Sequence, residues 1–224
     1  MIDIHTHIIP NVDDGSQSIE TSRRLLELEK ENGVTKVFLT PHQNAMKLEK
    51  SKILDAFIKF KNDVSDIDIE LFLGSEIYYY DNLINDIKNG TAITMNNSLF
   101  VLVEFSTRYD TNIIDKLYDI IVSGYIPIVA HIERYPYLKF SDYDEIAKMG
   151  ARIQVNTKSF HEKGYKKIIK YLLKKNYIDF VGTDCHDLEN RSVEYNFNKI
   201  FKKYPQFKTK LEYDEMLIIK KWLS

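Results

Sequence analysis

The stretch MIDIHTHIIPNVDDGS, from Met1 to Ser16, decides the fold and the chemistry expected of this chain. Ile2 and Ile4 alternate with other residues, which predicts a short strand pointing into a core. His5 and His7 end that strand on one side of it, because strand side chains repeat every second residue. Two imidazoles so placed can reach one metal ion, but an H-x-H pattern by itself is also common as a purely structural pair.

Composition indicates a globular protein with a sizeable core. The chain has 224 residues, of which 44% are hydrophobic and 12% aromatic, so we expect a single domain over residues 1–224. The net charge of -2 argues against nucleic acid as a partner. Lysines gather at 166–175 and 199–210 in helical patterns, which we interpret as solvated helix faces. Cys185 is the only cysteine, which excludes an internal disulfide and fits a reducing compartment.

The sequence carries no recognisable targeting or membrane signal. Met1 leads directly into a strand pattern, without the basic and apolar regions of a signal peptide. No run approaches the roughly 18 apolar residues of a membrane span. We therefore expect a cytoplasmic protein that does not insert into membranes, and the sequence leaves its oligomeric state open.

Strand patterns alternate with helix patterns seven times along the chain. Strands are predicted at the N-terminus and over 36–40, 69–74, 99–105, 126–130, 152–156 and 178–183. Helices are predicted from Ser16 or Ser18 to Asn32 and over 48–64, 81–88, 112–123, 142–149, 166–175, 193–204 and 213–223. This alternation implies parallel strands with right-handed crossovers. The turn NVDDGS lacks the G-x-G-x-x-G pattern of an open dinucleotide-binding sheet, so an α/β barrel is favoured.

Chemistry in such barrels lies at the carboxyl ends of the strands, and this chain places histidines and carboxylates there. The candidates at predicted strand ends or in the loops after them are His5, His7, Asp14, His42, Glu76, Glu104, His131, Asp184 and His186. Asn156 ends the sixth strand, and His161 is the one histidine placed elsewhere. Mixed imidazole and carboxylate ligands suit Mn, Fe or Zn, whereas a structural zinc site would favour thiolates. We interpret this rim as a metal site.

Each candidate also has a simpler interpretation. Glu104 could merely be exposed at a strand end, and His131 could be a core histidine with its hydrogen bonds satisfied. Asp184 and His186 could cap the next helix. Together the simpler interpretations require nine independent coincidences on one face, so the metal interpretation is preferred.

The motifs HTH with a downstream DDG, TPH, GSEIYY, LVEF, AHIERY and TDCHDLENR occur in this order. In combination they resemble the PHP (polymerase and histidinol phosphatase) superfamily and, within it, the bacterial capsule-locus protein-tyrosine phosphatases, from Met1 to about Arg191. The resemblance implies a distorted (β/α)7 barrel with a trinuclear metal site, usually manganese-activated, in which Fe or Zn occupies some positions in some members. It also implies a phosphotyrosine protein as substrate, such as a bacterial tyrosine kinase that controls capsule or exopolysaccharide synthesis.

The same resemblance implies roles for individual residues. One ion would be held by His5, His7, Glu76 and Asp184, a second by Glu76, Glu104 and His131, and a third by Asp14, His42 and His186. Arg134 and Arg191 would bind the phosphate, a task that suits the forked guanidinium group. From the residues alone, Arg134 could instead pair with Glu133, and Arg191 could be a surface charge at a helix N-terminus.

A second phosphatase motif competes with this interpretation. Residues 185–192 read CHDLENRS and match the C-x5-R-[ST] loop of cysteine-dependent tyrosine phosphatases. That loop cradles phosphate with backbone amides and usually includes glycine, which is missing here. Asp184, Asp187 and Glu189 would repel phosphate and raise the thiol pKa. We interpret Cys185 as a small buried packing residue.

The function expected from the sequence is that of a metal-dependent protein-tyrosine phosphatase. The alternatives are a histidinol-phosphate phosphatase or another PHP phosphoesterase, including a nuclease. A third class is a PHP domain that has lost catalysis and only scaffolds a partner. The run Tyr78 to Tyr80 could stack on an aryl substrate or pack at the barrel rim, and the sequence does not separate the two.

Overall fold

The computed structural model describes residues 1–43, 48–193 and 198–219. Its strands are β1 (Ile2–Thr6), β2 (Lys36–Leu39), β3 (Glu70–Leu73), β4 (Glu76–Tyr78), β5 (Phe100–Glu104), β6 (Ile126–Val129), β7 (Arg152–Asn156) and β8 (Phe180–Gly182). Its helices are α1 (Ile19–Glu31), α2 (Lys50–Asp63), α3 (Leu83–Lys88), α4 (Ile113–Val122), α5 (Phe140–Lys148), α6 (Lys166–Lys175), α7 (Asn198–Lys203) and α8 (Pro205–Ile219). Part of the helix predicted over 193–204 lies outside the described residues. Within the described ranges, no helix is long and apolar enough to cross a bilayer.

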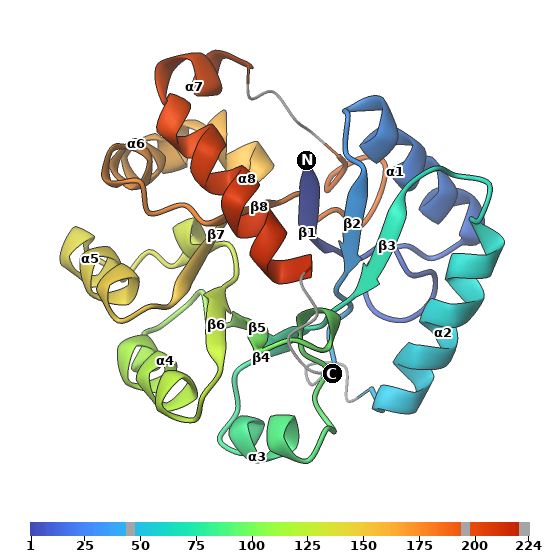
Figure 1. Ribbon diagram of the computed structural model, residues 1–224, viewed down its shortest axis with the longest axis horizontal. Coiled ribbons are helices and arrows are strands. Elements are labelled where there is room, and N and C mark those ends of the chain that lie inside the picture. Colours follow the sequence, from blue (N-terminus) through green and yellow to red (C-terminus); the bar gives the residue numbers. More distant parts are fainter. Residues whose placement is uncertain (44–47, 194–197, 220–224) are drawn as a thin grey trace.

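The strands form a parallel barrel with helices α1 to α6 around it (Figure 1). Hydrogen-bonded neighbours run β1-β2-β3 in one group and β4-β5-β6-β7-β8 in the other. One seam between the groups closes where Thr6 bridges to Cys185, just after β8. At the other seam β3 continues into β4 after Gly74 and Ser75, so these two segments act as one bent strand. Counted in this way, the barrel has the seven strands predicted from the sequence, and the strand predicted over 69–74 extends further.

Each strand buries one face in the barrel interior and the other against the helices. Phe38 and Leu102 belong to the interior cluster, whereas their neighbours Val37 and Val103 pack against the surrounding helices. Strands buried on both faces are expected in a parallel sheet covered by crossover helices. This packing explains why the strand segments are continuous apolar runs.

The first crossover helix shows how local sequence sets the element boundaries. The hydroxyl of Ser18 accepts a hydrogen bond from the Thr21 backbone N–H at 3.1 Å, which satisfies one of the free donors at the start of α1. Gly33 follows the helix with φ of 81°, a left-handed conformation that suits glycine. Leu25 and Leu26 are buried on the barrel side. The start predicted at Ser18 and the end predicted at Asn32 are confirmed.

Helix α8 lies across the barrel at the amino-terminal ends of the strands, opposite the rim (Figure 1). It begins at Pro205, so the prediction of a last helix over 213–223 is wrong at its start. Proline fits the first turn of a helix, where its missing N–H would be unpaired anyway. The pattern was hidden because the buried face of α8 carries Asp214 and Glu215 beside Leu211 and Ile218.

The buried charges of α8 are paired with groups at the strand starts. Lys210 Nζ contacts Asp179, just before β8, and lies 2.7 Å from Asp214 Oδ2. Arg152, the first residue of β7, lies 3.0 Å from Asp179 Oδ1. Glu215 Oε1 accepts a hydrogen bond from the Ile2 backbone N–H at 2.9 Å. These pairs hold the helix on the barrel although much of its buried face is polar.

The pH dependence of stability tests the contact of Glu215. Burial, reinforced by Glu212 and Asp3, raises the pKa of Glu215 to about 7 from an ordinary value of 4.5. The folded state therefore holds this proton more tightly than the unfolded state, so stability falls as pH rises from about 4.5 to about 7. Glu215→Gln removes the charge and keeps an acceptor for Ile2. We expect it to raise the free energy of unfolding at pH 8 by on the order of 1–3 kcal/mol, with little gain at pH 4.

Chemical denaturation at both pH values, at constant metal concentration, measures this effect. Asp55→Asn is the control, because Asp55 is an exposed carboxylate on α2, a different helix from that of Glu215. An equal effect of Glu215→Gln at the two pH values would show that the charge is not what destabilises the fold.

Candidate metal centre

Glu76, the first residue of β4, is buried at the centre of a cluster of histidines. Its Oε2 atom lies 3.1 Å from His5 Nε2 and 3.2 Å from His7 Nε2. The same oxygen lies 3.2 Å from His42 Nδ1, and the Oε1 atom lies 2.8 Å from His131 Nε2. The four rings come from β1 and from the segments after β2 and β6, so one carboxylate is contacted from three strand ends.

Asp184, which follows β8, joins this cluster from the other side. Its Oδ1 atom lies 3.7 Å from His5 Nε2 and 3.5 Å from His7 Nε2. The candidate ligand atoms of these three residues and Glu76 all lie within 4.8 Å of one another. All four side chains are buried. The structure therefore brings together the set that was expected around one ion.

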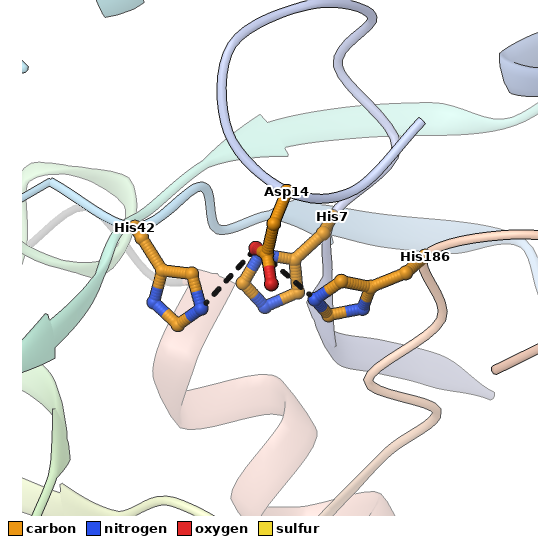
Figure 2. Close-up of side chains that lie close together, drawn as sticks. All are labelled: His7, Asp14, His42 and His186. Atoms are coloured by element: carbon orange, nitrogen blue, oxygen red, sulfur yellow. Dashed lines mark ion pairs between the residues drawn. The ribbon is translucent and has the colours of Figure 1, made fainter. Parts of the chain in front are cut away.

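Asp14 lies on the open side of the cluster, with 55% of its side chain exposed. Its Oδ1 atom lies 3.6 Å from His42 Nε2 and 3.5 Å from His186 Nε2. Figure 2 shows the carboxylate of Asp14 between these two rings, with His7 beside them. The four side chains offer ligand atoms within 4.8 Å of one another. The three residues expected to hold the third ion, Asp14, His42 and His186, therefore lie together, and His7 lies among them.

Glu104, at the end of β5, borders the cluster near His131. Its Oε1 atom lies 3.7 Å from His131 Nε2, which is itself 2.8 Å from Glu76. Glu104 and Glu76 also form a group with His42 whose ligand atoms lie within 4.8 Å of one another. The expected set of Glu76, Glu104 and His131 is therefore contiguous, and His42 lies at the border of two sets.

Arg134 and Arg191 both contact Asp184 at the rim. Arg134, in the short 3-10 helix Ile132–Arg134, places Nη1 3.2 Å from Asp184 Oδ2. Arg191 Nη2 lies 2.7 Å from Asp184 Oδ1, and its Nη1 lies 3.9 Å from Asp14 Oδ2. Their side chains are 36% and 38% exposed, so solvent reaches both guanidinium groups. Glu133, the alternative partner of Arg134, instead accepts hydrogen bonds from Asn156 and Ser159.

Local backbone features position His5 in β1 and His7 directly after it. The register between β1 and β2 shifts between Asp3 and Thr6. Such irregularities re-aim side chains next to active sites. They allow Ile4 to join the interior cluster while His5 also points into the barrel. A Cβ on Gly182 of β8 would lie 2.5 Å from His5 Cβ, so only glycine leaves room for this ring.

His131 and Asp184 adopt left-handed backbone conformations, with φ of 31° and 54°. The other non-glycine residues with positive φ in the described chain are all asparagines: Asn11, Asn96, Asn97, Asn112 and Asn176. Asparagine, aspartate and histidine adopt this conformation more often than other non-glycine residues, but it is still uncommon for them. Strained conformations of this kind concentrate at functional sites. No motif in the sequence indicates the left-handed conformation of His131 and Asp184.

Three polar residues support the histidines without having been predicted to do so. Asp13 Oδ2 lies 2.7 Å from His7 Nδ1 and accepts a hydrogen bond from the His42 backbone N–H at 3.0 Å. A carboxylate on Nδ1 fixes the tautomer that leaves Nε2 free as a ligand. Gln154 Oε1 lies 3.2 Å from His5 Nδ1, and Asn156 Nδ2 donates to Asp184 Oδ2 at 3.1 Å.

A sequence signal for two of these residues was present. Gln154 and Asn156 stand two apart in β7, so they share one face while Ile153 and Val155 share the other, and a polar pair at a strand end indicates a site. The Gln154 side chain also donates to Asn156 at 2.9 Å. The role of Asp13 was hidden because it stands beside Asp14, and the sequence alone does not separate a ligand from its support.

The donor set fits a metal centre. His42 Nδ1 and His186 Nε2 are buried and make no hydrogen bond to a described residue. Burial lowers the pKa of His42, and burial together with the neighbouring His7 lowers the pKa of His186 to about 3. Both rings are therefore neutral at pH 7, which is the form that binds metal ions. Burial and the charge of Glu76 raise the pKa of Glu104 to about 8, a crowding of carboxylates that a cation would relieve.

The tyrosine run after Glu76 is engaged in packing at the rim. The Tyr79 ring stacks on Phe105 with centroids 5.6 Å apart, and Lys116 Nζ lies 4.7 Å from the same ring centroid. The Tyr80 hydroxyl donates to Asp86 Oδ2 at 2.6 Å. These contacts favour the packing interpretation for Tyr79 and Tyr80.

Cys185 is fully buried in the apolar cluster between β1, β2 and helix α1. Burial, reinforced by Glu29 and Asp3, raises the pKa of its thiol well above the ordinary value. A thiol in this setting is a poor nucleophile, because the thiolate is the reactive form. The geometry agrees with the packing role predicted from the sequence.

The fold and the rim define a class of protein, a (β/α)7 barrel with a candidate centre for several metal ions. Two arginines, whose guanidinium groups suit the binding of phosphate, lie beside that centre. A family model described as capsular polysaccharide synthesis, CpsB/CapC, matches residues 1–217. This chain belongs to the CpsB/CapC family. The predicted relationship to capsule-locus tyrosine phosphatases is thereby confirmed.

Curated relatives and solved structures support the assignment. The chain is 33% identical to tyrosine-protein phosphatase CpsB of Streptococcus pneumoniae, over 94% of this chain and 93% of that protein. It is 28% identical to tyrosine-protein phosphatase YwqE of Bacillus subtilis (strain 168), over 86% and 80%. A crystal structure from a study of YwqE and CpsB, described as unique metal-dependent tyrosine phosphatases, matches with a TM-score of 0.88 at 24% identity, over 100% of this chain and 96% of that one.

A second solved structure shows the same fold at greater distance. Histidinol phosphate phosphatase from Lactococcus lactis, in complex with zinc, L-histidinol and phosphate, matches with a TM-score of 0.57 at 14% identity. The match covers 93% of both chains. Together the two structures confirm the predicted PHP-type barrel.

The burial of Cys185 leads to a prediction that separates the two phosphatase motifs. We expect Cys185→Ala and Cys185→Ser to keep kcat/KM toward a phosphotyrosine peptide within about threefold, a change in barrier of less than ~1 kcal/mol. Activity is measured at matched metal content and corrected for the folded fraction, because a buried hydroxyl in the serine variant can lower stability. Loss of several orders of magnitude in both variants, with a trapped phosphocysteine in the native protein, would establish cysteine chemistry instead.

Proposed function

We propose that this protein is a metal-dependent phosphatase that removes phosphate from tyrosine side chains of a protein substrate. The observation that carries the proposal is the convergence of nine imidazole and carboxylate donors at one rim, beside two arginines that share Asp184. A relative named tyrosine-protein phosphatase, 33% identical over nearly the whole chain, supports the reaction and the amino acid on which it acts.

In this proposal the donors form three overlapping metal sites. His5, His7, Glu76 and Asp184 hold one ion, Glu76, Glu104 and His131 a second, and Asp14, His42 and His186 the third. Ions held by these residues would neutralise charge on the phosphate oxygens and would make water acidic enough to serve as the nucleophile. The mixed nitrogen and oxygen donors support Mn²⁺ as the resident ion and also suit Fe or Zn at some positions.

The arginines bind the phosphate in this proposal. Arg134 and Arg191 lie on Asp184, and a phosphate dianion offers oxygens that suit the same forked donors. Their partial exposure leaves them accessible to a substrate on a protein surface. Because the guanidinium groups carry a fixed charge, they stabilise the transition state as charge shifts on the phosphoryl group.

The substrate is proposed to be a phosphotyrosine protein of the same pathway. The family's description, capsular polysaccharide synthesis, supports a bacterial tyrosine kinase that regulates capsule or exopolysaccharide synthesis as this substrate. A cytoplasmic location belongs to the same proposal. Tyrosine also suits the chemistry, because a phenolate, with a pKa of about 10, departs more readily than the alkoxide of serine.

Metal removal tests the mechanism. We expect extensive dialysis against a chelator to abolish hydrolysis of a phosphotyrosine peptide, and Mn²⁺ to restore it best among common divalent ions. The same preparation is assayed on a phosphoserine peptide, histidinol phosphate and a dinucleotide, with the phosphotyrosine peptide expected to give the highest kcat/KM. Full activity after chelation would exclude the metal mechanism, and a preference for histidinol phosphate would replace the proposed substrate.

Paired variants separate phosphate binding from metal binding. Arg134 has no lone pair for a metal, so Arg134→Ala should keep its metals and its fold. Removing one donor to a developing charge typically lowers the rate by on the order of 10²–10³, and we expect a loss of kcat/KM in this range. His131→Ala should lose metal as well as activity, because its ring lies 2.8 Å from Glu76.

Metal content by elemental analysis is measured beside kinetics for both variants. Arg24→Ala is the matched control, because Arg24 is a surface residue of α1 that pairs with Glu31. If Arg134→Ala is fully active, or loses metal as His131→Ala does, Arg134 does not bind the phosphate.

A further inference from the structure

A small cavity opens from the metal centre towards helix α6. Its volume is about 230 Å³, and its lining includes Arg134, Arg191 and Asp184. Lys158, Glu162 and Tyr165 also line it, and Lys158 Nζ lies 3.9 Å from Glu162 Oε1. Tyr165 immediately precedes α6, so the cavity leads from the two arginines to the first turn of that helix.

The start of α6 and the turn before it carry a group of exposed lysines that the fold does not use. Lys163, Lys166, Lys167 and Lys170 are exposed and have no ion pair with a described residue. Lys175, at the far end of α6, shows the contrast, because its Nζ lies 3.4 Å from Asp144 Oδ1. We call Lys163, Lys166 and Lys167 the α6 lysine group, because they lie nearest the cavity along the chain.

The placement of these lysines also opposes local stability. The first turn of α6 contains Lys166 and Lys167 and no acidic residue. The helix dipole favours acidic side chains at this end, so two lysines there add to a positive potential. Inside the cavity the cations are paired, because Lys158 faces Glu162 and both arginines contact Asp184. Among the described residues, the lysines at the start of α6 are therefore the unpaired positive charges beside it.

We propose that the α6 lysine group docks an acidic stretch of the phosphotyrosine substrate as it leaves the metal centre through this cavity. This inference rests on the proposed phosphatase function and adds the charge of the substrate beside the phosphotyrosine. The recognised chemistry is anionic, and it can be supplied by carboxylate side chains or by a second phosphate. An arrangement of this kind speeds encounter and lowers KM without touching the reacting atoms.

The experiment compares phosphotyrosine peptides of equal length with neutral flanks, with glutamate flanks and with a second phosphotyrosine in the flank. For the native holoenzyme at low salt, we expect KM for the anionic peptides to be about tenfold below that for the neutral one, with similar kcat. The glutamate and phosphate arms show which anion is preferred. Moderate salt should remove most of the difference, because exposed charges are screened.

The test variant is the triple substitution Lys163→Ala, Lys166→Ala and Lys167→Ala. It should raise KM for the anionic peptides about tenfold and leave kcat unchanged. Hydrolysis of p-nitrophenyl phosphate, which is too small to reach α6, reports on the metal centre alone and should stay at the native rate. A glutamate-rich peptide without phosphate should inhibit the native enzyme competitively and the triple variant much less.

The matched control replaces two exposed lysines at the C-terminal ends of helices α5 and α6. Lys148→Ala with Lys174→Ala changes the last turns of α5 and α6, on the side away from the rim. This variant should retain the native KM for every peptide.

Several results would overturn the inference. Equal KM values for neutral and anionic peptides in the native enzyme would do so, as would an equal rise in KM for p-nitrophenyl phosphate in the triple variant. Loss of binding to phosphatidylserine vesicles in the triple variant, with unchanged peptide KM, would assign the lysines to a membrane surface instead. No hydrolysis of any phosphotyrosine substrate by the metal-loaded native protein would overturn the proposed function itself, and this inference with it.

Discussion

The contact between the buried carboxylate of Glu76 and four imidazoles is the interaction on which the rest of the site depends. A buried charge without partners costs several kcal/mol, so these contacts constrain every segment that supplies a ring. Glu76 belongs to the strand group β4 to β8, whereas His5, His7 and His42 come from the group β1 to β3 or the segment after it. The polar cluster therefore joins the two groups of strands beside the backbone bridge between His42 and Glu76.

Much of this arrangement could be predicted, because the position of a residue along a barrel strand determines where that residue lies in the fold. A residue at the end of a parallel strand lies at the rim whichever strand carries it, so His42 and His131 reach the same carboxylate, that of Glu76, without any local signal between them. The alternation of strand and helix patterns was enough to place all nine candidates on one face. The same logic located Arg134, because it follows His131 within one turn.

Features that depend on contacts between distant segments could not be predicted in this way. The bend between β3 and β4 follows from each half pairing with a different neighbour. The start of α8 was hidden because Asp214 and Glu215 interrupt its apolar pattern, and their partners Lys210 and Ile2 are recognisable only in the folded chain. Asp13 supports His7 rather than occupying the open position of Asp14, a distinction set by the path of one loop.

The left-handed backbone at His131 and Asp184 also has a consequence for stability. Elsewhere in the described chain the non-glycine residues with this conformation are all asparagines. A change to glycine at either position would relieve strain on the order of 1–3 kcal/mol and remove a donor from the cluster. The two donors are therefore retained at a cost in stability, so a more stable variant with glycine there would be expected to bind metal less well.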